Sequence, residues 1–445
     1  MKILIAGAGE VGTHLAKLLS REQQEVTVLD SDADKLAPLD SNYNLLTYCG
    51  LPTAFSDLKA AGAGHCDLFI AVTVSEASNI TACSIAKSLG AKQTVARIDN
   101  YEYMKRDHKE FFASIGVNHL IYPEFLAAKE IATGLKHRWA RHWFELHNGE
   151  LIVVGVKLRS GARLCGMQLK ELASEHRFFH VSAIKHGGDT IMPRGDDRLM
   201  DGDVVYFTTT AEHVDTIRDI CGKSAGEVKR VLIVGGSRIA VRLLNLEGMD
   251  AYRFKIIESD RKRCEWVAER CPDTKIVHGD GRDTELLLEE DGGQYDAFVA
   301  LTGSSEANIL ASLTAKEMGA TKTIAEVEDL QFISVAENLN IGTIINKKLL
   351  ASGKIFQIML EADADSSKFM ALADADVAEI EAKEGSKITS ARVKDLRLSH
   401  DMTIAGLIRN HKGMLVEGNT LIEPGDHVVV FCLADAIHKV ERLFN

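Results

Sequence analysis

The residues best suited to ligand chemistry lie near the start of the chain, where Gly7-Ala8-Gly9-Glu10-Val11-Gly12 follows a short apolar run. In a G-x-G-x-x-G sequence the first glycine permits a tight turn and the second lets the backbone approach a pyrophosphate. The third allows the following helix to pack closely on the strand. The start of that helix offers N–H groups and the positive end of its dipole to a phosphate. The motif predicts a dinucleotide-binding loop, and the alternative is a glycine-rich turn without a ligand.

An acidic residue stands where such a loop needs one. Asp30 ends the run VTVLD and lies 18 residues beyond Gly12. An acid at the end of the second strand accepts hydrogen bonds from ribose hydroxyls and repels a 2′-phosphate. This position favours NAD(H) or an adenine nucleotide over NADP(H), although a solvated carboxylate at the end of a strand is the alternative.

Three further polar residues follow later strands of the same predicted sheet. Thr73 and Asn79 span the end of the fourth strand and the start of the next helix, and Arg97 ends the fifth strand. Ligands of doubly wound sheets lie at these carboxyl ends. Thr73 could instead cap the helix, with Glu76 completing a capping box. Arg97 could bind a phosphate or form a structural ion pair.

The whole pattern occurs twice, at a constant offset of 228 or 229 residues. The strand KILIAGAG is repeated as RVLIVGGS, and DLFIAVT is repeated as DAFVALT. A second candidate site therefore consists of Gly235, Gly236, Ser237, Arg238, Ile239, Glu258, Thr302 and Asn308. Repetition of a complete motif set indicates a duplicated domain rather than coincidence.

The second copy departs from the first at the positions that would touch a ligand. Ser237 replaces the second glycine and places a side chain where pyrophosphate would approach, while Glu326 replaces Arg97. The third strand ends in His278-Gly279-Asp280 in the second copy but in Cys49-Gly50-Leu51 in the first. The two sites are therefore predicted to differ, with the tighter NAD-class site in the first copy.

The elements that position these residues are short apolar strands alternating with helices, which indicate parallel sheets covered on both faces. Each half then ends in a smaller α/β segment, where Gly202–Asp203 or Gly425–Asp426 leads into a β-branched run and predicts a hairpin. The predicted fold class is α/β, with two doubly wound domains, each followed by a small α/β domain. Their predicted bounds are 1–123, 145–223, 228–346 and 370–445, with connecting helices over Glu124–Leu135 and Lys347–Leu360.

Composition restricts the function classes. The chain has 52 Lys and Arg against 64 Asp and Glu, so its net charge of −12 gives no electrostatic reason to bind nucleic acid or anionic lipid. No stretch approaches the roughly 18 apolar residues of a membrane span. The eight cysteines contain no CxxC pair, the histidines have no metal-ligand spacing, and no nucleophile or P-loop motif is present. We therefore expect reduced thiols, no metal site and no catalytic residues.

The sequences GAGEVG, VLD, AVTVSEASN and VARI, together with their repetition, resemble the TrkA family of regulatory components of bacterial Trk potassium uptake. The modules are similar to regulator-of-potassium-conductance N and C domains, and the resemblance covers essentially the whole chain. It implies ligand positions at Gly7–Val11, Asp30, Thr73, Val74 and Arg97. In the second copy it implies Gly235–Ile239, Glu258, Gly279, Asp280, Thr302 and Gly303.

The resemblance further implies a tetrameric assembly on the cytoplasmic face of the inner membrane. This assembly would bind NAD(H) or ATP/ADP and gate a separate potassium channel subunit. Two alternatives remain open. The first, an NAD-dependent oxidoreductase, needs a sizeable substrate domain with an acid–base residue beside the nicotinamide. The second is a nucleotide-binding regulator of another cation transporter. It differs from a regulator of potassium uptake only in its membrane partner.

Overall fold

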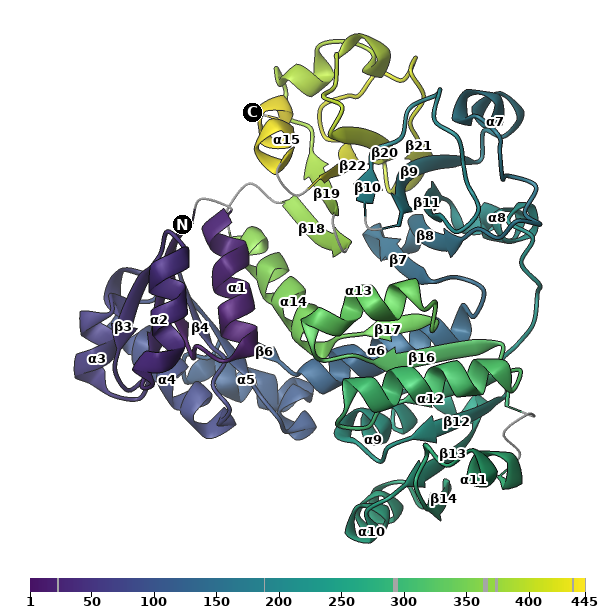
Figure 1. Ribbon diagram of the computed structural model, residues 1–445. Coiled ribbons are helices and arrows are strands. Elements are labelled where there is room, and N and C mark those ends of the chain that lie inside the picture. Colours follow the sequence, from purple (N-terminus) through teal and green to yellow (C-terminus); the bar gives the residue numbers. More distant parts are fainter. Residues whose placement is uncertain are drawn as a thin grey trace. The chain divides into compact units, whose positions relative to one another are not determined.

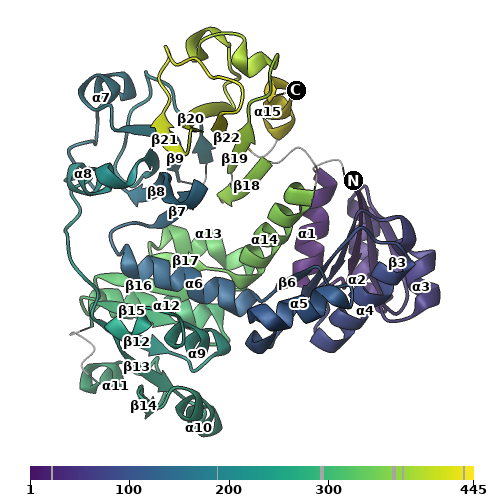
Figure 2. The same ribbon diagram turned by 180° about the vertical axis from the view of Figure 1, so that it is seen from behind.

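The computed structural model describes residues 1–21, 24–187, 189–290, 295–362, 367–372, 375–433 and 436–444 (Figures 1 and 2). Two compact units make up the chain. The first contains Met1–Ala128 and Asn346–Asp363, and the second contains Lys129–Ile345 and Ala364–Asn445. Each unit therefore combines segments that lie far apart in the sequence.

A six-stranded parallel sheet forms the centre of the first unit, in the order β3-β2-β1-β4-β5-β6. Its strands are β1 (Lys2–Ala6), β2 (Glu25–Asp30), β3 (Leu46–Cys49), β4 (Leu68–Ala71), β5 (Gln93–Arg97) and β6 (His119–Ile121). The helices between them are α1 (Glu10–Arg21), α2 (Ala33–Asn42), α3 (Phe55–Ala60), α4 (Glu76–Leu89) and α5 (Arg106–Ser114), and α6 (Pro123–Lys136) follows. This strand order is the doubly wound order expected from the alternating pattern.

The central strands are apolar along their whole length because helices cover both faces of the sheet. Every residue of β4 is buried, and only Lys2 of β1 is exposed. Strand β1 pairs in parallel with β2 and with β4, so the strand order reverses beside its carboxyl end. In doubly wound sheets this reversal opens the crevice in which ligands bind.

The connecting helix of the second half packs within the first unit. Helix α14 (Lys347–Ala362) lies beside α1 in both views, and the Lys348 ammonium contacts the Glu10 carboxylate (Figures 1 and 2). Glu10 belongs to the glycine-rich loop, so this ion pair joins α14 to the first candidate site. Both connecting helices predicted from the sequence are confirmed.

The second unit contains a parallel sheet of the same order, β14-β13-β12-β15-β16-β17. Its strands are β12 (Arg230–Val234), β13 (Arg253–Glu258), β14 (Lys275–His278), β15 (Ala297–Ala300), β16 (Lys322–Glu326) and β17 (Thr343–Ile345). The associated helices are α9 (Arg238–Leu244), α10 (Arg261–Arg270), α11 (Thr284–Glu289), α12 (Ser305–Glu317) and α13 (Leu330–Asn338). The identical order confirms the predicted duplication.

Two five-stranded antiparallel sheets complete the second unit. The first has the order β10-β9-β11-β8-β7, with β7 (His142–Leu146), β8 (Leu151–Lys157), β9 (Phe179–His186), β10 (Asp189–Ile191), β11 (Val204–Thr209), α7 (Leu169–Glu175) and α8 (Val214–Ile220). The second has the order β18-β19-β22-β20-β21, with β18 (Ser367–Leu372), β19 (Ala375–Glu381), β20 (Met402–Arg409), β21 (Lys412–Leu415), β22 (His427–Leu433) and α15 (Ile437–Phe444).

The two antiparallel sheets share one hydrophobic core and lie together in both views (Figures 1 and 2). Val153 and Tyr206 of the first sheet belong to the same buried cluster as Val429 and Phe431 of the second. Strands with one apolar face must bury that face against another layer, and each small sheet provides that layer for the other.

The predicted hairpins at the two Gly-Asp turns are wrong. Strand β11 follows Gly202–Asp203 but pairs with β8 and β9, and β22 follows Gly425–Asp426 but pairs with β19 and β20. The turns instead bury a carboxylate that organises the local structure. Asp426 accepts hydrogen bonds from the Arg409 guanidinium at 2.6 and 2.8 Å. The repeated Gly-Asp pair therefore marks a buried carboxylate before a strand, and not a hairpin turn.

Among the described helices, none is both long and apolar enough to cross a bilayer. None of the eight cysteines, all of which are described, forms a disulfide.

Candidate functional site

Asp30 organises the first glycine-rich loop. The Ala8 N–H donates to Asp30 Oδ2 at 2.6 Å, and the Asp32 N–H donates to Asp30 Oδ1 at 2.9 Å. A carboxylate oxygen can accept two hydrogen bonds, so acceptor capacity remains on Asp30 for ribose hydroxyls. Asp30 therefore joins the end of β2 to the loop, in addition to any contact it makes with solvent or a ligand.

The three glycines of this loop have distinct structural roles. Gly7 has φ +111°, a conformation that residues with a Cβ atom rarely adopt. A Cβ at Gly12 would lie 1.9 Å from the Gly7 carbonyl oxygen, so close helix packing excludes any side chain there. A Cβ at Gly9 would meet no atom within 4 Å. Gly9 is therefore not required by the packing of the protein, which is consistent with space kept for a ligand.

The loop presents its backbone rather than its apolar side chains. Helix α1 begins at Glu10, and its first N–H groups have no partner within the helix. Val11 is buried in the first copy, and so is Ile239 in the second. These residues can contribute to a ligand site only through their backbone, as anion sites at helix N-termini do.

Asn79 holds the neighbouring strand ends together. Its amide oxygen accepts from the Thr73 N–H at 2.9 Å and from the Thr73 hydroxyl at 2.6 Å, and its amide nitrogen donates to the Arg97 carbonyl at 2.9 Å. The side chain of Asn79 is only 1% exposed. It therefore positions Thr73 and Arg97 and has no free group for a ligand.

The predicted capping box at Thr73 is wrong. The N-cap of α4 is Ser75, whose hydroxyl accepts from the Ser78 N–H at 3.2 Å. The Glu76 carboxylate instead accepts from the N–H groups of Asp99 and Asn100, at 2.8 and 3.0 Å. Because Ser75 directly precedes the first helical residue, it takes the capping role.

The remaining first-copy residues lie at the same sheet edge. Arg97 contacts Asp99 at 3.5 Å, as the ion-pair alternative predicted, and its side chain stays 24% exposed. Val74 is 90% exposed, so its side chain is accessible at this sheet edge.

The second copy repeats this framework. The Gly236 N–H donates to Glu258 Oε2 at 2.6 Å, and the Asp260 N–H donates to Oε1 at 2.8 Å. Asn308 accepts from the Thr302 N–H at 2.9 Å and donates to the Glu326 carbonyl at 2.8 Å. The strand-end acid and the buried asparagine are therefore structural parts of both copies.

A cavity of about 530 Å³ lies against the second loop. Its lining includes Gly235, Ser237, Glu258, Asp280, Thr302 and Gly303, all predicted from the sequence. Its volume falls in the range of roughly 300–1,000 Å³ that is typical of small-molecule sites. Ser237 uses its hydroxyl to cap α9 by accepting from the Ala240 N–H at 3.3 Å. Gly279 lies outside the lining, where a Cβ would meet Leu286 at 2.4 Å.

Two arginines that the sequence analysis missed also line this cavity. The Arg263 guanidinium lies over the Trp266 ring at 3.9 Å and donates to the Gly236 carbonyl at 2.7 Å. Arg282 pairs with Asp280 at 2.6 Å, and this bond holds the pKa of Asp280 below its usual range. Burial lowers the pKa of Arg263. The sequence contains one signal for Arg263: Lys35 stands at the same position of the first copy, so both copies have a cation there.

Comparison with known proteins places the duplicated framework in a family. The TrkA-N domain model matches residues 3–123 and 231–347, and the TrkA-C domain model matches residues 153–222 and 377–445. The chain belongs to the TrkA family. Its TrkA-N domains contain the parallel sheets and both glycine-rich loops, and its TrkA-C domains contain the antiparallel sheets.

Relatives within the TrkA family match the chain over its full length. The Trk system potassium uptake protein TrkA of Haemophilus influenzae is 31% identical over 455 residues, covering 100% of this chain and 99% of the relative. The protein of the same name from Halomonas elongata is 30% identical over 453 residues, with the same coverage. A homolog from Archaeoglobus fulgidus is 29% identical over 449 residues and covers all of both chains.

Solved structures show the same fold. The RCK domain of GsuK has a TM-score of 0.63 at 14% identity, covering 100% of this chain and 94% of that one. The GsuK channel bound to NAD has a TM-score of 0.62 at 14% identity and covers 100% of this chain and 78% of that one. At this identity the likeness supports the fold class: Rossmann-like parallel sheets with smaller antiparallel sheets.

Proposed function

We propose that this chain is a nucleotide-sensing regulatory subunit of a potassium uptake system, which binds NAD(H) or ATP/ADP and gates a membrane potassium channel partner. One observation carries the proposal. In each copy, a carboxylate at the end of the second strand is bonded to the N–H of the glycine-rich loop, at 2.6 Å in both. This bond fixes the loop, so that its other N–H groups can face a pyrophosphate, and it leaves acceptor capacity on the carboxylate for a ribose.

The family relatives supply the transport context. The full-length relatives are named as potassium uptake proteins, and the GsuK channel is described as bound to NAD and to ADP. We propose the same ligand classes here. The proposed contacts are Gly7–Gly12, Asp30, Thr73, Val74 and Arg97 in the first copy, and Gly235–Ile239, Glu258, Asp280, Thr302 and Gly303 in the second. Asn79 and Asn308 position these groups.

Binding, rather than catalysis, is the proposed output. Among the described residues that line the cavity at the second loop, the side chains able to exchange a proton are Glu258 and Asp280. Both are already engaged, Glu258 by the N–H groups of Gly236 and Asp260 and Asp280 by Arg282. An oxidoreductase would change nicotinamide absorbance when incubated with NAD(H) and a panel of 2-hydroxy acids, alcohols and aldehydes. We expect no change, and turnover that disappears in a glycine-loop variant would establish the enzyme alternative.

Regulation requires a partner and a shape change. We propose a homotetramer that docks on the cytoplasmic face of a Trk-type channel subunit, with four modules bounded at 1–123, 145–223, 228–346 and 370–445. A nucleotide shifts such an assembly only by its differential affinity for the two shapes, which is typically about 1–3 kcal/mol, or about 5- to 150-fold. Docking would use a complementary protein surface, since the net charge of −12 disfavours anionic lipid.

The test is potassium flux into vesicles that contain the channel subunit, with and without this protein, across NADH, NAD⁺, ATP and ADP. We expect flux to change at least several-fold between nucleotides only when the protein is present. Co-purification from the native membrane fraction distinguishes a potassium channel from another cation transporter. Flux that is indifferent to the protein under every nucleotide, with no co-purification, would refute the proposal.

A further inference from the structure

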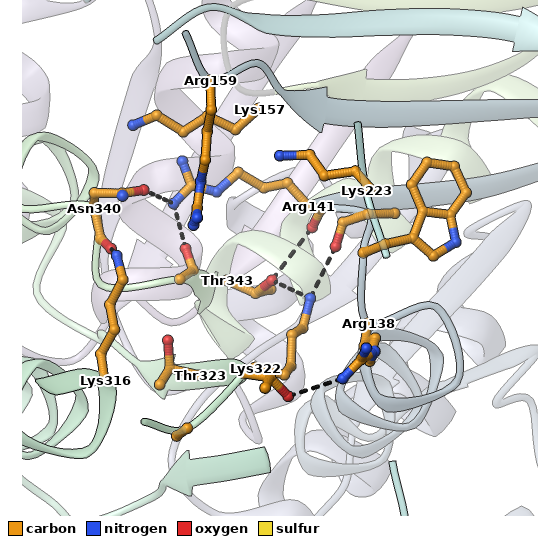
Figure 3. Close-up of a pocket in the computed structure, with 15 residues that line it drawn as sticks. Arg138, Arg141, Lys157, Arg159, Lys223, Lys316, Lys322, Thr323, Asn340 and Thr343 are labelled. Atoms are coloured by element: carbon orange, nitrogen blue, oxygen red, sulfur yellow. Dashed lines mark hydrogen bonds between the residues drawn. The ribbon is translucent and has the colours of Figure 1, made fainter. Parts of the chain in front are cut away.

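A second cavity lies at the opposite end of the second parallel sheet from the glycine-rich loop. Its volume is about 110 Å³, and it is lined by the starts of β16 and β17, the end of α12 and residues of the first antiparallel domain (Figure 3). Lys322 begins β16 and Thr343 begins β17, so the cavity faces the amino ends of these strands. It is therefore separate from the nucleotide site, which lies at the carboxyl ends.

The lining of this cavity is strongly cationic. Seven of its residues are Lys or Arg, and none is Asp or Glu. The second parallel domain contributes Lys316 and Lys322, and the segment before β7 contributes Arg138 and Arg141. Lys157, Arg159 and Lys223 come from the first antiparallel domain. Figure 3 shows these side chains gathered around one space from separate segments of the chain.

Four of these cations are fixed in place by uncharged oxygen atoms. Lys322 is 5% exposed, and its ammonium donates to the Ala140 carbonyl and to the Thr343 hydroxyl, both at 2.9 Å. Arg141 donates to the Gly342 carbonyl at 2.6 Å, and Lys316 donates to the Asn340 carbonyl at 2.6 Å. Arg138 donates to the Thr321 hydroxyl at 3.1 Å. These bonds orient the side chains without neutralising them.

The other three cations have no such bonds. Within the part of the chain that the structure describes, Lys157, Arg159 and Lys223 form no ion pair. The nearby Glu337 is already engaged by Lys185 at 3.0 Å. Burial raises the pKa of Glu130, the acid near Lys322, and so opposes its negative charge. Asp201 acts on Lys157 and opposes the lowering of its pKa, but it lies outside the lining. The positive charge of the cavity is therefore only partly compensated by the protein.

Burial and mutual repulsion lower the pKa values of several of these cations. Burial and the charge of Arg141 lower the pKa of Lys322 to about 7. Burial, followed by the charges of Arg141 and Arg159, lowers the pKa of Lys316 and of Lys157. Like charges held close together disfavour one another, and a bound anion would relieve this cost.

We propose that this cavity binds a tetrahedral phosphate group, held by Arg141, Lys157, Arg159, Lys223, Lys316 and Lys322. A volume of about 110 Å³ is well below the roughly 300–1,000 Å³ typical of sites for whole small molecules, which suits one phosphate group. Guanidinium forks bind phosphate oxygens in pairs, and lysines add point charges. The site joins the second parallel domain to the first antiparallel domain, so its occupancy stabilises their contact.

The test uses inorganic phosphate at constant ionic strength, followed by calorimetry and thermal unfolding of the full chain. We expect saturable binding and a rise in Tm that potassium chloride does not reproduce. Arg159→Gln should weaken phosphate binding by about tenfold or more, as expected for the loss of a charged hydrogen bond. Because Arg159 is exposed and repels its neighbours, this variant should fold and should be no less stable without phosphate.

The matched control is Arg163→Gln, which removes the same charge from an exposed position of the same domain outside the cavity. It should keep the phosphate response. Pyrophosphate and ATP, tested beside phosphate, distinguish a free anion from the terminal phosphate of a larger ligand by their sensitivity to Arg159→Gln. Equal responses of Arg159→Gln, Arg163→Gln and the parent protein would overturn the proposal. So would a response that Gly9→Val abolishes and Arg159→Gln preserves, because it would place the phosphate on the glycine-rich loop.

Discussion

Two glycines of the first loop allow binding to be separated from folding. Gly9→Val places a side chain where a Cβ would meet nothing within 4 Å, whereas Gly12→Ala places one 1.9 Å from the Gly7 carbonyl oxygen. We expect Gly9→Val to lose nucleotide affinity while keeping its fold. We expect Gly12→Ala to lose stability. The second copy provides a control, because Ala240 stands at the position of Gly12 and is fully buried there.

The magnitudes follow from the geometry. A Cβ at Gly12 would have to move by more than 1 Å to reach the lower limit of 3.0 Å for real Cβ contacts. Such overpacking typically costs about 1–3 kcal/mol. A valine at position 9 would block the loop N–H groups from a pyrophosphate. Each hydrogen bond to a charged group contributes about 1.5–3 kcal/mol, so the loss of one weakens binding by about 10- to 150-fold.

Calorimetric titration with NADH and ATP, paired with urea unfolding, tests both expectations. Gly9→Val should keep the parent midpoint and slope of unfolding and lose its first-copy binding. Gly12→Ala should shift the midpoint to lower urea, and Ala240→Gly should not gain stability in the second copy. Unchanged affinity and stoichiometry for both nucleotides in Gly9→Val would refute the assignment of the first loop.

Two further predictions concern buried polar groups. Asn79→Ala removes hydrogen bonds to Thr73 and to the Arg97 carbonyl, so it should lower the free energy of unfolding in urea by about 1–3 kcal/mol. The control is Thr81→Ala, at an exposed position of the same helix. Equal effects of the two variants would contradict the role of Asn79. Burial lowers the pKa of His180 from 6.5 to about 4, so the unfolded chain binds more protons in that window. Stability should therefore fall as pH drops from 6.5 to 4, with a slope of at most about 1.4 kcal/mol per pH unit from this group. His180→Gln should flatten the profile, and an unchanged slope would exclude His180 as its source.

Local sequence predicted the conformation of the first glycine-rich loop, because that conformation depends on backbone sterics alone. Gly7 has a positive φ, and a Cβ atom at Gly12 would clash with the Gly7 carbonyl oxygen. Glycine satisfies both conditions, so the residue type alone indicates them. The hydrogen-bond partners of side chains were harder to predict, because some of them lie far away in the sequence. Thr73 and Glu76 have the spacing of a capping box, yet Ser75 caps the helix and Glu76 bonds to a loop 23 residues away.

The sequence by itself determined the duplication, the parallel sheets and the two glycine-rich loops, because each depends on short-range periodicity and on the steric limits of glycine. Only the tertiary structure decided how the strands after the Gly-Asp turns pair. Strand β11 pairs with β8, and β22 pairs with β19, because packing sets these long-range contacts. It also decided where the cations gather. Lys157 and Lys322 are 165 residues apart in sequence, and only the docking of two domains brings them to one cavity. Charge clusters of this kind arise from long-range contacts, which no local pattern encodes.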